Sequence, residues 1–499
     1  MFNVSQLAST LDREGEEPIY RQLIRHIRAQ IDSGSLPSGS RLPASRELAD
    51  SLGISRISVV NAYAELRAEG YLSAHAGRGT FVAREVTNEQ RAERPQIHSI
   101  RDQSNSSDRS LRDLMRMARQ PGVIYFGQGA PQVEMLPVQY LRDAMNTVFE
   151  RDGTRALGYE APEGYGPLRN AVRDYVSALG IRCTTRDILI TGGTQQALDL
   201  VIQALLSEGE TLVTEDPTYL GMLDIARTRR LNVVGIPIDQ DGIRLDILEA
   251  FIAERQPRLI YVMPSFQNPT GVVMPLHRRR QLINLAMQYG VTILEDGVYH
   301  EFRYEGDHIP PLRALDEYGV VIHASGFTKM LLPGIRIGYV ISDSKHHQRI
   351  VRVKQSADIS TPGLNQRAIH LMLERGVMAQ QLQRNNREFK RRRDIAVMAA
   401  RKHFPAGTQF RTPLGGLYLW VRFPNQGPTA AELYLTAVQR GVGYAIGNIF
   451  YAGQADPYSV RLNYGAHRPE DIEVGFKRLG EAWRECAAGY AEMERTHVL

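Results

Sequence analysis

The stretch that decides the fold is His323-Ala-Ser-Gly-Phe-Thr-Lys329-Met-Leu-Leu-Pro-Gly-Ile-Arg336-Ile-Gly338. A strand-like run over 319–324 leads to a lysine, and a proline–glycine turn places Arg336 seven positions after it. A lysine at a strand end can form a Schiff base with an aldehyde cofactor, and an arginine can hold a phosphate on that cofactor. Taken alone, the segment is better explained as a solvated surface loop, so the cofactor interpretation depends on the rest of the chain.

The composition is that of an ordinary globular protein, and 499 residues suggest roughly three domains. A net charge of +5 is mild for this length and does not by itself indicate nucleic-acid binding. The two cysteines, Cys183 and Cys486, form no metal-binding pattern, so we expect no metal and a reducing compartment. We see no signal peptide and no apolar run long enough to span a bilayer, so we expect a cytoplasmic protein without a membrane partner.

From about Ile124 onward, short apolar runs alternate with helical segments. The runs lie at 187–191, 211–214, 259–263, 291–294 and 320–323. This alternation predicts an α/β fold with a mostly parallel sheet and helices on both faces. The last stretch, roughly 385–499, predicts an amphipathic helix, a strand at 417–421 and closing helices, which together form a smaller C-terminal subdomain.

Chemistry-bearing residues follow these runs, where ligands of open α/β sheets bind. Gly192-Gly193-Thr194-Gln195 follows the first run, and such a turn exposes peptide N–H groups to a phosphate, although turns of this kind are common. Tyr219 follows the second run, where it can stack on a flat ring or serve as an ordinary tyrosine at the edge of the core.

The third and fourth runs are followed by an amide, a carboxylate and a phenol. Asn268 can bond a ring hydroxyl, and Tyr299 can bond the same oxygen. A buried Asp296 beside a pyridine nitrogen would keep it protonated and make the ring an electron sink, whereas a lone aspartate here is usually a cap or turn residue. Five such elements in this order are hard to obtain by chance.

The ordered set resembles the fold-type I pyridoxal-phosphate (PLP) enzymes of the aspartate-aminotransferase-like group, over about residues 120–490. The resemblance implies PLP as cofactor and Lys329 as the Schiff-base lysine. It also implies the rest of the cofactor site: Asp296 at the pyridine nitrogen, Asn268 and Tyr299 at the ring oxygen, Tyr219 stacked on the ring, and Gly193, Thr194, Gln195, Thr328 and Arg336 around the phosphate.

Two further motifs support this resemblance. The segment 158–164 resembles the one whose tyrosine, here Tyr159, reaches the phosphate of a partner subunit, which implies a homodimer. The segment 460–464 resembles the motif whose arginine, here Arg461, grips a substrate carboxylate. The sequence departs from the family at Gly326, where relatives carry serine or threonine, and at Glu160, where they often carry glycine. The first departure either weakens the phosphate grip or shifts it to Ser325.

The N-terminal region predicts three helices and a β-hairpin. Ile19, Leu23, Ile27 and Ile31 form one apolar helix face. Ser45 can cap a second helix over 46–52 and Ser55 a third, with Val59, Ala62, Tyr63 and Leu66 pointing inward. Two short strands around 76–79 predict a wing. A short helix, a glycine turn and a further helix form a helix-turn-helix pattern.

This region resembles the winged helix-turn-helix of GntR-type regulators, including Arg46-Glu47-Leu48-Ala49, Leu52-Gly53-Ile54-Ser55-Arg56 and 77–82. The resemblance implies that Arg46, Ser55 and Arg56 reach the major groove of double-stranded DNA, and that Gly77 and Arg78 approach the minor groove or backbone. Residues 1–86 contain ten arginines, no lysine and ten carboxylates, so this interpretation depends on arginine placement, and a helical accessory module with solvated arginines is the alternative.

We therefore expect a DNA-binding domain at 12–84, a flexible polar linker at 85–120 and an aminotransferase-like domain at 121–499. This tandem order is similar to the MocR subgroup of GntR-family regulators. It implies a transcriptional regulator that binds operator DNA and senses a small amino compound through a Schiff base at Lys329. The alternatives are an active aminotransferase with a DNA-binding appendage, and a sensor for which PLP itself is the effector.

Overall fold

The computed structural model describes residues 19–32, 35–37, 39–68, 71–75, 79–82, 98–99, 115–116 and 120–497. The chain divides into two compact units, Met1–Gln96 and Ile97–Leu499. Each unit has its own hydrophobic core.

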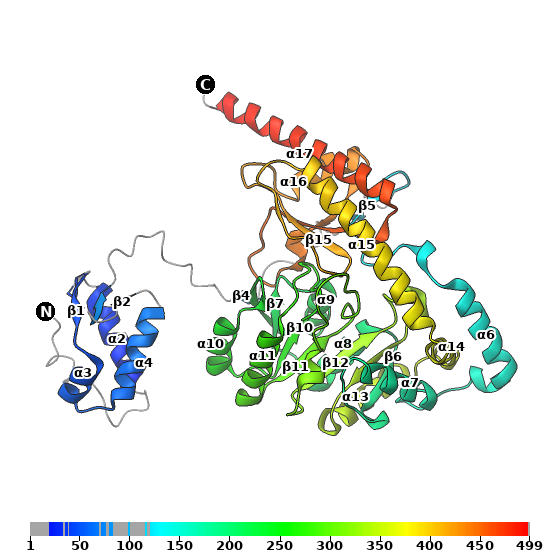
Figure 1. Cartoon of the computed structure of the whole chain (residues 1–499), viewed down its shortest axis with the longest axis horizontal. Coiled ribbons are helices and arrows are strands. Elements are labelled where there is room, and N and C mark those ends of the chain that lie inside the picture. Colours follow the sequence, from blue (N-terminus) through cyan, green and yellow to red (C-terminus); the bar gives the residue numbers. More distant parts are fainter. Residues whose placement is uncertain are drawn as a thin grey trace. The chain divides into compact units, whose positions relative to one another are not determined.

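The described residues of the first unit form three helices and a small antiparallel sheet (Figure 1). The helices are α2 (Ile19–Asp32), α3 (Ser45–Leu52) and α4 (Arg56–Ala68). The sheet has the order β1 (Arg41–Leu42), β3 (Gly79–Val82), β2 (Leu72–His75). The hairpin of β2 and β3 is the predicted wing, and β1, which extends it by pairing with β3, was not predicted.

The apolar faces expected from the sequence form the core of this unit. Leu23 and Ile27 of α2 are buried, as are the four inward residues of α4: Val59, Ala62, Tyr63 and Leu66. Ser45 is the first residue of α3 and Ala44 occupies the N-cap, so the capping role expected of Ser45 is wrong. Gly53 ends α3 in the left-handed conformation, which favours glycine because it carries no Cβ.

A mostly parallel sheet forms the centre of the second unit, in the order β4-β8-β7-β10-β11-β12-β13-β6, with β9 paired to β8 (Figure 1). The pairs among β8, β7, β10, β11 and β12 are parallel, whereas β13 runs antiparallel to β12 and to β6. The strands are β4 (His98–Ser99), β6 (Ile188–Thr191), β7 (Thr211–Asp216), β8 (Asn232–Asp239), β9 (Gly242–Ile243), β10 (Leu259–Val262), β11 (Thr292–Asp296), β12 (Val321–Gly326) and β13 (Gly338–Ile341).

Helices cover both faces of this sheet, which explains why its strands are apolar on both sides. Along β10, Leu259 and Tyr261 pack into one hydrophobic cluster, and Ile260 and Val262 pack into another. The first cluster includes residues of α7 (Gly166–Ser177), α8 (Thr194–Leu205), α9 (Leu220–Thr228) and α14 (Gly363–Glu374); the second includes α10 (Leu245–Arg255), α11 (Leu276–Tyr289) and α12 (Leu312–Leu315). Residues of α6 (Val138–Asp152) and α13 (Ser344–Asp358) also belong to the first cluster.

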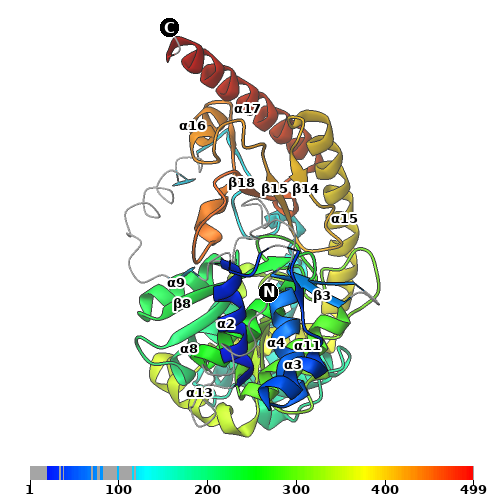
Figure 2. The ribbon, with the colours of Figure 1, turned by 90° about the vertical axis from the view of Figure 1, so that its left-hand side faces the viewer.

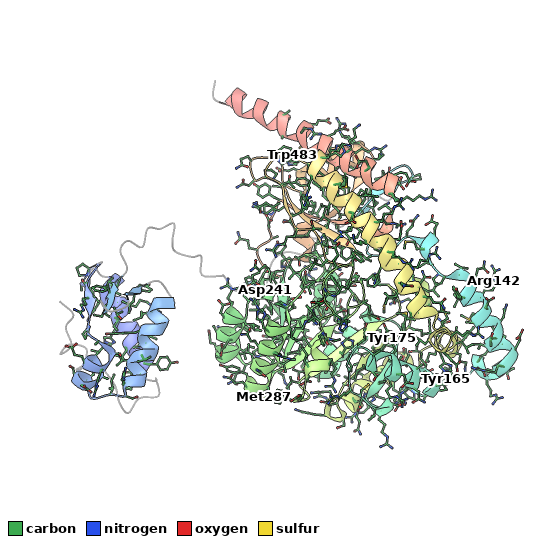
Figure 3. The ribbon with its side chains drawn as sticks, in the orientation of Figure 1. Arg142, Tyr165, Tyr175, Asp241, Met287 and Trp483 are labelled. Carbon is green, nitrogen blue, oxygen red and sulfur yellow. The ribbon has the colours of Figure 1, made fainter. Side chains whose placement is uncertain are left out.

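A smaller antiparallel sheet forms the C-terminal subdomain, in the order β14 (Gln409–Phe410), β15 (Tyr418–Arg422), β18 (Ser459–Asn463), β17 (Ala445–Ile446). Figure 2 shows α15 (Val377–His403) and α17 (Pro469–His497) running beside it, with α16 (Glu432–Gln439) at its far end. Trp483, labelled on α17 in Figure 3, packs against the core of this subdomain. The start of the unit returns to the same core, because β5 (Ile124–Tyr125) pairs with β16 (Val442–Gly443).

Across the described part of the chain, no helix combines the length and the apolar character that crossing a membrane requires.

Candidate functional site

A cavity lies where β7, β10, β11 and β12 end. Nine of the twelve residues that line it were predicted from the sequence: Thr194, Gln195, Tyr219, Asn268, Asp296, Tyr299, Thr328, Lys329 and Arg336; the other three are Leu198, Met263 and Val298. Most of the predicted residues follow a strand or open α8, whereas Arg336 precedes β13. The parallel strands bring their carboxyl ends to one edge of the sheet.

Lys329 follows β12, and its amine donates a hydrogen bond to the Gly129 carbonyl oxygen. Desolvation lowers the pKa of Lys329 to about 8, and the positive charges of Arg461 and then Arg336 add to this effect. The negative charge of Asp296 acts in the opposite direction. A fraction of this amine is therefore neutral near physiological pH, and the neutral form is the nucleophile that attacks an aldehyde.

Asp296 is buried at the end of β11. It accepts hydrogen bonds from the Tyr261 phenol at 2.9 Å and from the Val298 backbone N–H at 3.1 Å. Burial raises the pKa of Asp296 to about 6 although both hydrogen bonds oppose the rise. A cation beside a buried carboxyl of raised pKa stabilises the ionised form of that carboxyl. A protonated pyridine nitrogen is such a cation.

The N-terminus of α8 lies at one end of the cavity. Thr194 Oγ1 and Thr328 Oγ1 are buried and have no hydrogen-bond partner within the described residues. A Cβ on Gly193, whose φ is +94°, would lie 2.7 Å from Arg336 Nη2, so the absence of a side chain lets the guanidinium lie against the turn. Two unpartnered hydroxyls, an arginine and a helix N-terminus together fit a phosphate.

The departure at Gly326 has a steric reason. Gly326 lies opposite Gly338 in the antiparallel pair of β12 and β13, and a Cβ on Gly326 would lie 2.8 Å from the Gly338 Cα. The Ser325 hydroxyl hydrogen-bonds the Tyr339 phenol, directly across the same pair. Within the part of the chain that the structure describes, the hydroxyls left unpartnered at this end are therefore those of Thr194 and Thr328.

Two tyrosines of the cavity are held by neighbouring side chains. The Tyr219 phenol donates to Gln195 Oε1 at 3.0 Å, and the Gln195 amide donates to the Gly221 carbonyl oxygen at 3.1 Å. The Tyr299 hydroxyl lies 2.6 Å from that of Tyr418. These contacts fix the ring positions before any ligand is present.

Arg461, on β18, adjoins the cavity through Asn268. Its Nη1 donates to Asn268 Oδ1 at 2.8 Å and its Nη2 donates to the Gly127 carbonyl oxygen at 2.9 Å. The guanidinium lies over the rings of Tyr418, at 4.3 Å, and Phe450, at 4.8 Å. Its Nε is buried without a partner among the described residues. This is a preorganised fork that suits a carboxylate.

Besides the three lining residues named above, three residues that contact the site were not predicted: Gly129, Tyr261 and Tyr418. Tyr418 belongs to a strand that the sequence did predict, at 417–421, but nothing in that run distinguishes a site residue from a core residue. Tyr261 interrupts an apolar strand with a phenol, which is a weak signal for a buried polar contact. Gly129 lies in the short glycine-rich segment Gly127-Gln128-Gly129, and that repeat is the signal that could have found it.

Tyr159 does not line the cavity of its own chain, and 85% of its surface is exposed. Glu160, the other departure, accepts a hydrogen bond from Arg367 at 2.6 Å. In the first unit, Arg46 at the start of α3, Ser55 before α4 and Arg56 at its first turn are exposed. Gly77 and Arg78 lie outside the described residues.

Comparison with known proteins defines the class. The family described as aminotransferase class I and II matches residues 121–479, and that described as bacterial regulatory proteins, gntR family, matches residues 19–82. The 2-aminoadipate transaminase of Thermus thermophilus is 33% identical over 76% of this chain and 94% of its own. The probable rhizopine catabolism regulatory protein MocR of Rhizobium meliloti is 28% identical over 95% of both chains.

Among solved structures, LysN, an α-aminoadipate aminotransferase from Thermus thermophilus in complex with N-(5'-phosphopyridoxyl)-L-leucine, superposes with a TM-score of 0.71. It is 32% identical and covers 76% of this chain and 95% of its own. The second unit is thus a fold-type I aminotransferase-like domain, joined to a winged helix-turn-helix. The chain belongs to the aminotransferase class I and II family and, by its gntR-family domain, to the MocR-type regulators.

Pyridoxal phosphate is the cofactor of this domain, and the residues present fit it. The lysine of lowered pKa, the carboxyl of raised pKa and the two unpartnered threonine hydroxyls correspond to its aldehyde, its ring nitrogen and its phosphate.

Proposed function

We propose that the protein is a transcriptional regulator that binds an operator through its winged helix and senses an amino compound in the PLP site of its second domain. The GntR-type domain fused to an aminotransferase-like domain supports a regulator. The observation that carries the sensing role is the pairing of Lys329 with Asp296 in one cavity, each with a pKa displaced toward neutrality.

In this proposal protein side chains would hold the cofactor at five points. Lys329 holds the aldehyde carbon, Asp296 holds the ring nitrogen with Tyr261 supporting it, and Asn268 and Tyr299 hold the ring oxygen. Tyr219 covers the ring, and the phosphate is held by the turn that includes Gly193, Thr194 and Gln195, with Thr328, Arg336 and the partner's Tyr159. When bound, PLP supplies an aldehyde that condenses reversibly with amines and a ring that withdraws electrons.

The effector would be recognised by both of its functional groups. Its amine would compete with Lys329 for the cofactor, and its acidic group would bind the Arg461 guanidinium. An effector that makes these contacts better in one conformation than in the other shifts the equilibrium between the two, and the DNA-binding domains would be coupled to that equilibrium. A homodimer is part of this proposal, since Tyr159 is exposed in its own chain and would reach the partner's phosphate.

An active aminotransferase is the second candidate. Lys329 with a pKa of about 8 can also accept and return a proton, which is the role a transaminating lysine needs. A relative of this domain carries the name 2-aminoadipate transaminase. We favour the regulator because a DNA-binding domain contributes to no catalytic step, whereas it gives a sensing domain a direct output. PLP itself as the effector is the third possibility.

Lys329→Ala tests the site. The variant should lose the visible absorbance that the lysine-bound cofactor gives to the purified protein, and Lys345→Ala, an exposed lysine on α13, should keep it. An unchanged band in Lys329→Ala would contradict the assignment.

To separate the two functions, the wild-type protein loaded with PLP is mixed with a panel of amino acids and amines. A spectral change that stops after one equivalent and alters mobility of promoter DNA supports the sensor. Continuous accumulation of an oxo acid supports the aminotransferase and contradicts the purely regulatory role.

A further inference from the structure

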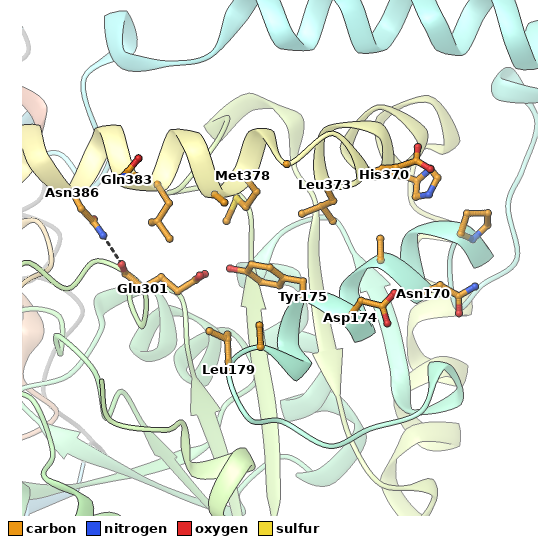
Figure 4. Close-up of a pocket in the computed structure, with 17 residues that line it drawn as sticks. Asn170, Asp174, Tyr175, Leu179, Glu301, His370, Leu373, Met378, Gln383 and Asn386 are labelled. Carbon is orange, nitrogen blue, oxygen red and sulfur yellow. Dashed lines mark hydrogen bonds between the residues drawn. The ribbon is translucent and has the colours of Figure 1, made fainter. Parts of the chain in front are cut away.

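A second cavity lies on the other side of the Lys329 segment, between α7, α14, α15 and the turn after β11 (Figure 4). Its volume is about 740 Å³, within the range of small-molecule sites. Much of its wall is apolar: Tyr175 and Leu179 from α7 and its following turn, Leu373 from α14, and Met378 and Leu382 from α15. It shares no lining residue with the cavity around Lys329.

None of the ionisable side chains that line this cavity is basic enough to carry a positive charge at neutral pH. Among the seventeen described residues that line it there are three carboxyls, on Asp174, Glu301 and Glu374, and no lysine or arginine. Asp174 and Glu374 are exposed, whereas Glu301 is partly buried. Burial lowers the pKa of the fourth titratable group, His370, so this imidazole is neutral at physiological pH.

Glu301 is the carboxyl without a partner. Its backbone carbonyl oxygen accepts a hydrogen bond from Asn386 Nδ2 at 2.8 Å, which fixes the residue at one end of the cavity (Figure 4). No described side chain donates to its carboxyl or supplies a positive charge, and burial alone raises the pKa of Glu301 to about 8. The PLP site makes no use of this group.

We propose that this cavity is a second ligand site, which binds an organic cation: an amine with an apolar body. The ammonium group would pair with the Glu301 carboxylate, and the hydrocarbon part would lie against Tyr175, Leu179 and Leu382. A cation is selected over an anion because every ionisable lining group is acidic or neutral, and an apolar body is selected because much of the wall is apolar.

The cavity adjoins the segment that carries Lys329. The Tyr175 hydroxyl lies 3.8 Å from the Met330 sulfur, and its ring centroid lies 5.9 Å from that of Phe327. Asn385, next to the Asn386 that holds Glu301, donates to the Met330 carbonyl oxygen at 3.1 Å. A ligand in this cavity is therefore separated from the lysine segment by a single layer of side chains.

The affinity for a cation should depend on pH through Glu301. Below pH 8 the carboxyl is mostly protonated, so each bound cation releases close to one proton and affinity rises about tenfold per pH unit until pH 8. The other ionisable groups that line the cavity are the Tyr175 phenol, the His370 imidazole and the carboxyls of Asp174 and Glu374. Burial lowers the pKa of His370, so this imidazole carries no positive charge that would oppose the cation.

The test uses the full-length PLP-loaded protein and N,N-dimethylbenzylamine, a cation that cannot condense with an aldehyde. Isothermal calorimetry should show saturable binding of this amine at one site. The neutral analogue N,N-dimethylbenzamide should show no binding. Glu301→Gln keeps the size of the side chain, and it should weaken binding about tenfold or more at pH 8 and remove the pH dependence. The matched control Glu317→Gln, an exposed glutamate outside the cavity, should leave both unchanged.

A second variant guards against a folding defect in the first. Ala379→Trp fills the cavity from α15 and should abolish binding while the visible absorbance at Lys329 and the thermal melting of the protein stay near wild type. Equal binding of the neutral analogue, an unchanged affinity in Glu301→Gln, or no saturable binding by the wild-type protein would each overturn the proposal.

Discussion

At the scale of single residues, the site contains two ionisable groups, Lys329 and Asp296, whose pKa values burial shifts in opposite directions. Desolvation disfavours charge, so it lowers the pKa of Lys329 to about 8 and raises that of Asp296 to about 6. Both shifts prepare the residues for PLP, because the amine becomes nucleophilic and the carboxyl gains from a cationic neighbour. The Tyr261 phenol limits the second shift by donating to Asp296.

Tyr261→Phe should therefore raise the pKa of Asp296 further above its usual value. A carboxyl whose pKa is higher in the folded than in the unfolded state costs stability as pH rises, from the unfolded value of 3.8 through the folded value. The melting temperature of the cofactor-free variant should fall more steeply between pH 4 and 8 than that of the cofactor-free wild type. Added PLP should reduce the difference, because its ring nitrogen supplies the cation.

A parallel pH profile for variant and wild type would contradict this role of Tyr261. Tyr289→Phe, at the last residue of α11 and outside the cavity, serves as the control.

The sequence could predict most residues of the site because each follows an apolar run, where local pattern is informative. Asp296 ends β11, and Asn268 and Lys329 follow β10 and β12. Tyr418 could not be predicted, because it reaches Tyr299 from a separate sheet and the contact spans 119 positions of sequence. A strand pattern gives the face on which a residue lies, but not the distant group that it meets.

At the scale of elements, the fold was predictable where burial is two-sided. The continuous apolar runs of β6, β7, β10, β11 and β12 reflect a sheet covered on both faces, and the predicted ranges agree within a few residues. β8 was missed although it is long, and β1 was missed because two residues carry no periodicity. The antiparallel direction of β13 also gives no sequence signal, since a buried strand is apolar in either direction.

The same scale decides how the first unit would meet DNA. Arg56 opens α4, and a guanidinium at the N-terminal turn of a recognition helix can reach base edges. Arg56→Ala should reduce the affinity for the promoter by about 1–3 kcal/mol relative to unrelated DNA, because a base contact discriminates between sequences.

Electrophoretic mobility shifts or fluorescence anisotropy at fixed salt would measure this loss. Arg25→Ala, an exposed arginine on α2, should change the affinity less and equally for both DNAs. If Arg56→Ala kept full promoter affinity, α4 would not be the recognition helix.

At the scale of the whole molecule, the exposed Tyr159 leaves the PLP site of one chain incomplete in our proposal. Tyr159→Phe removes one hydroxyl that would reach the partner's phosphate, so the affinity for PLP should fall by about 1 kcal/mol, roughly fivefold. Apparent PLP affinity of the wild type should rise with protein concentration over the range in which dimers form.

Fluorescence titration with PLP, together with sedimentation at the same concentrations, measures both effects. Tyr318→Phe, another exposed tyrosine, is the control and should bind PLP like the wild type. A wild-type affinity that does not depend on concentration across the dimerisation range would contradict a shared site.

The contact between Arg461 and Asn268 has a consequence for what the pocket can distinguish. In the free protein the guanidinium holds the amide by its oxygen, and that amide lies beside the expected position of the cofactor's ring oxygen. An acid that draws the guanidinium away also releases the amide, so a simple carboxylic acid without any nitrogen would alter the colour of the protein. The carboxylate and the amine of an amino acid would then act on the site separately, the first at Arg461 and the second at Lys329. An oxo acid would be a partial agonist or a competitor even though it does not displace Lys329.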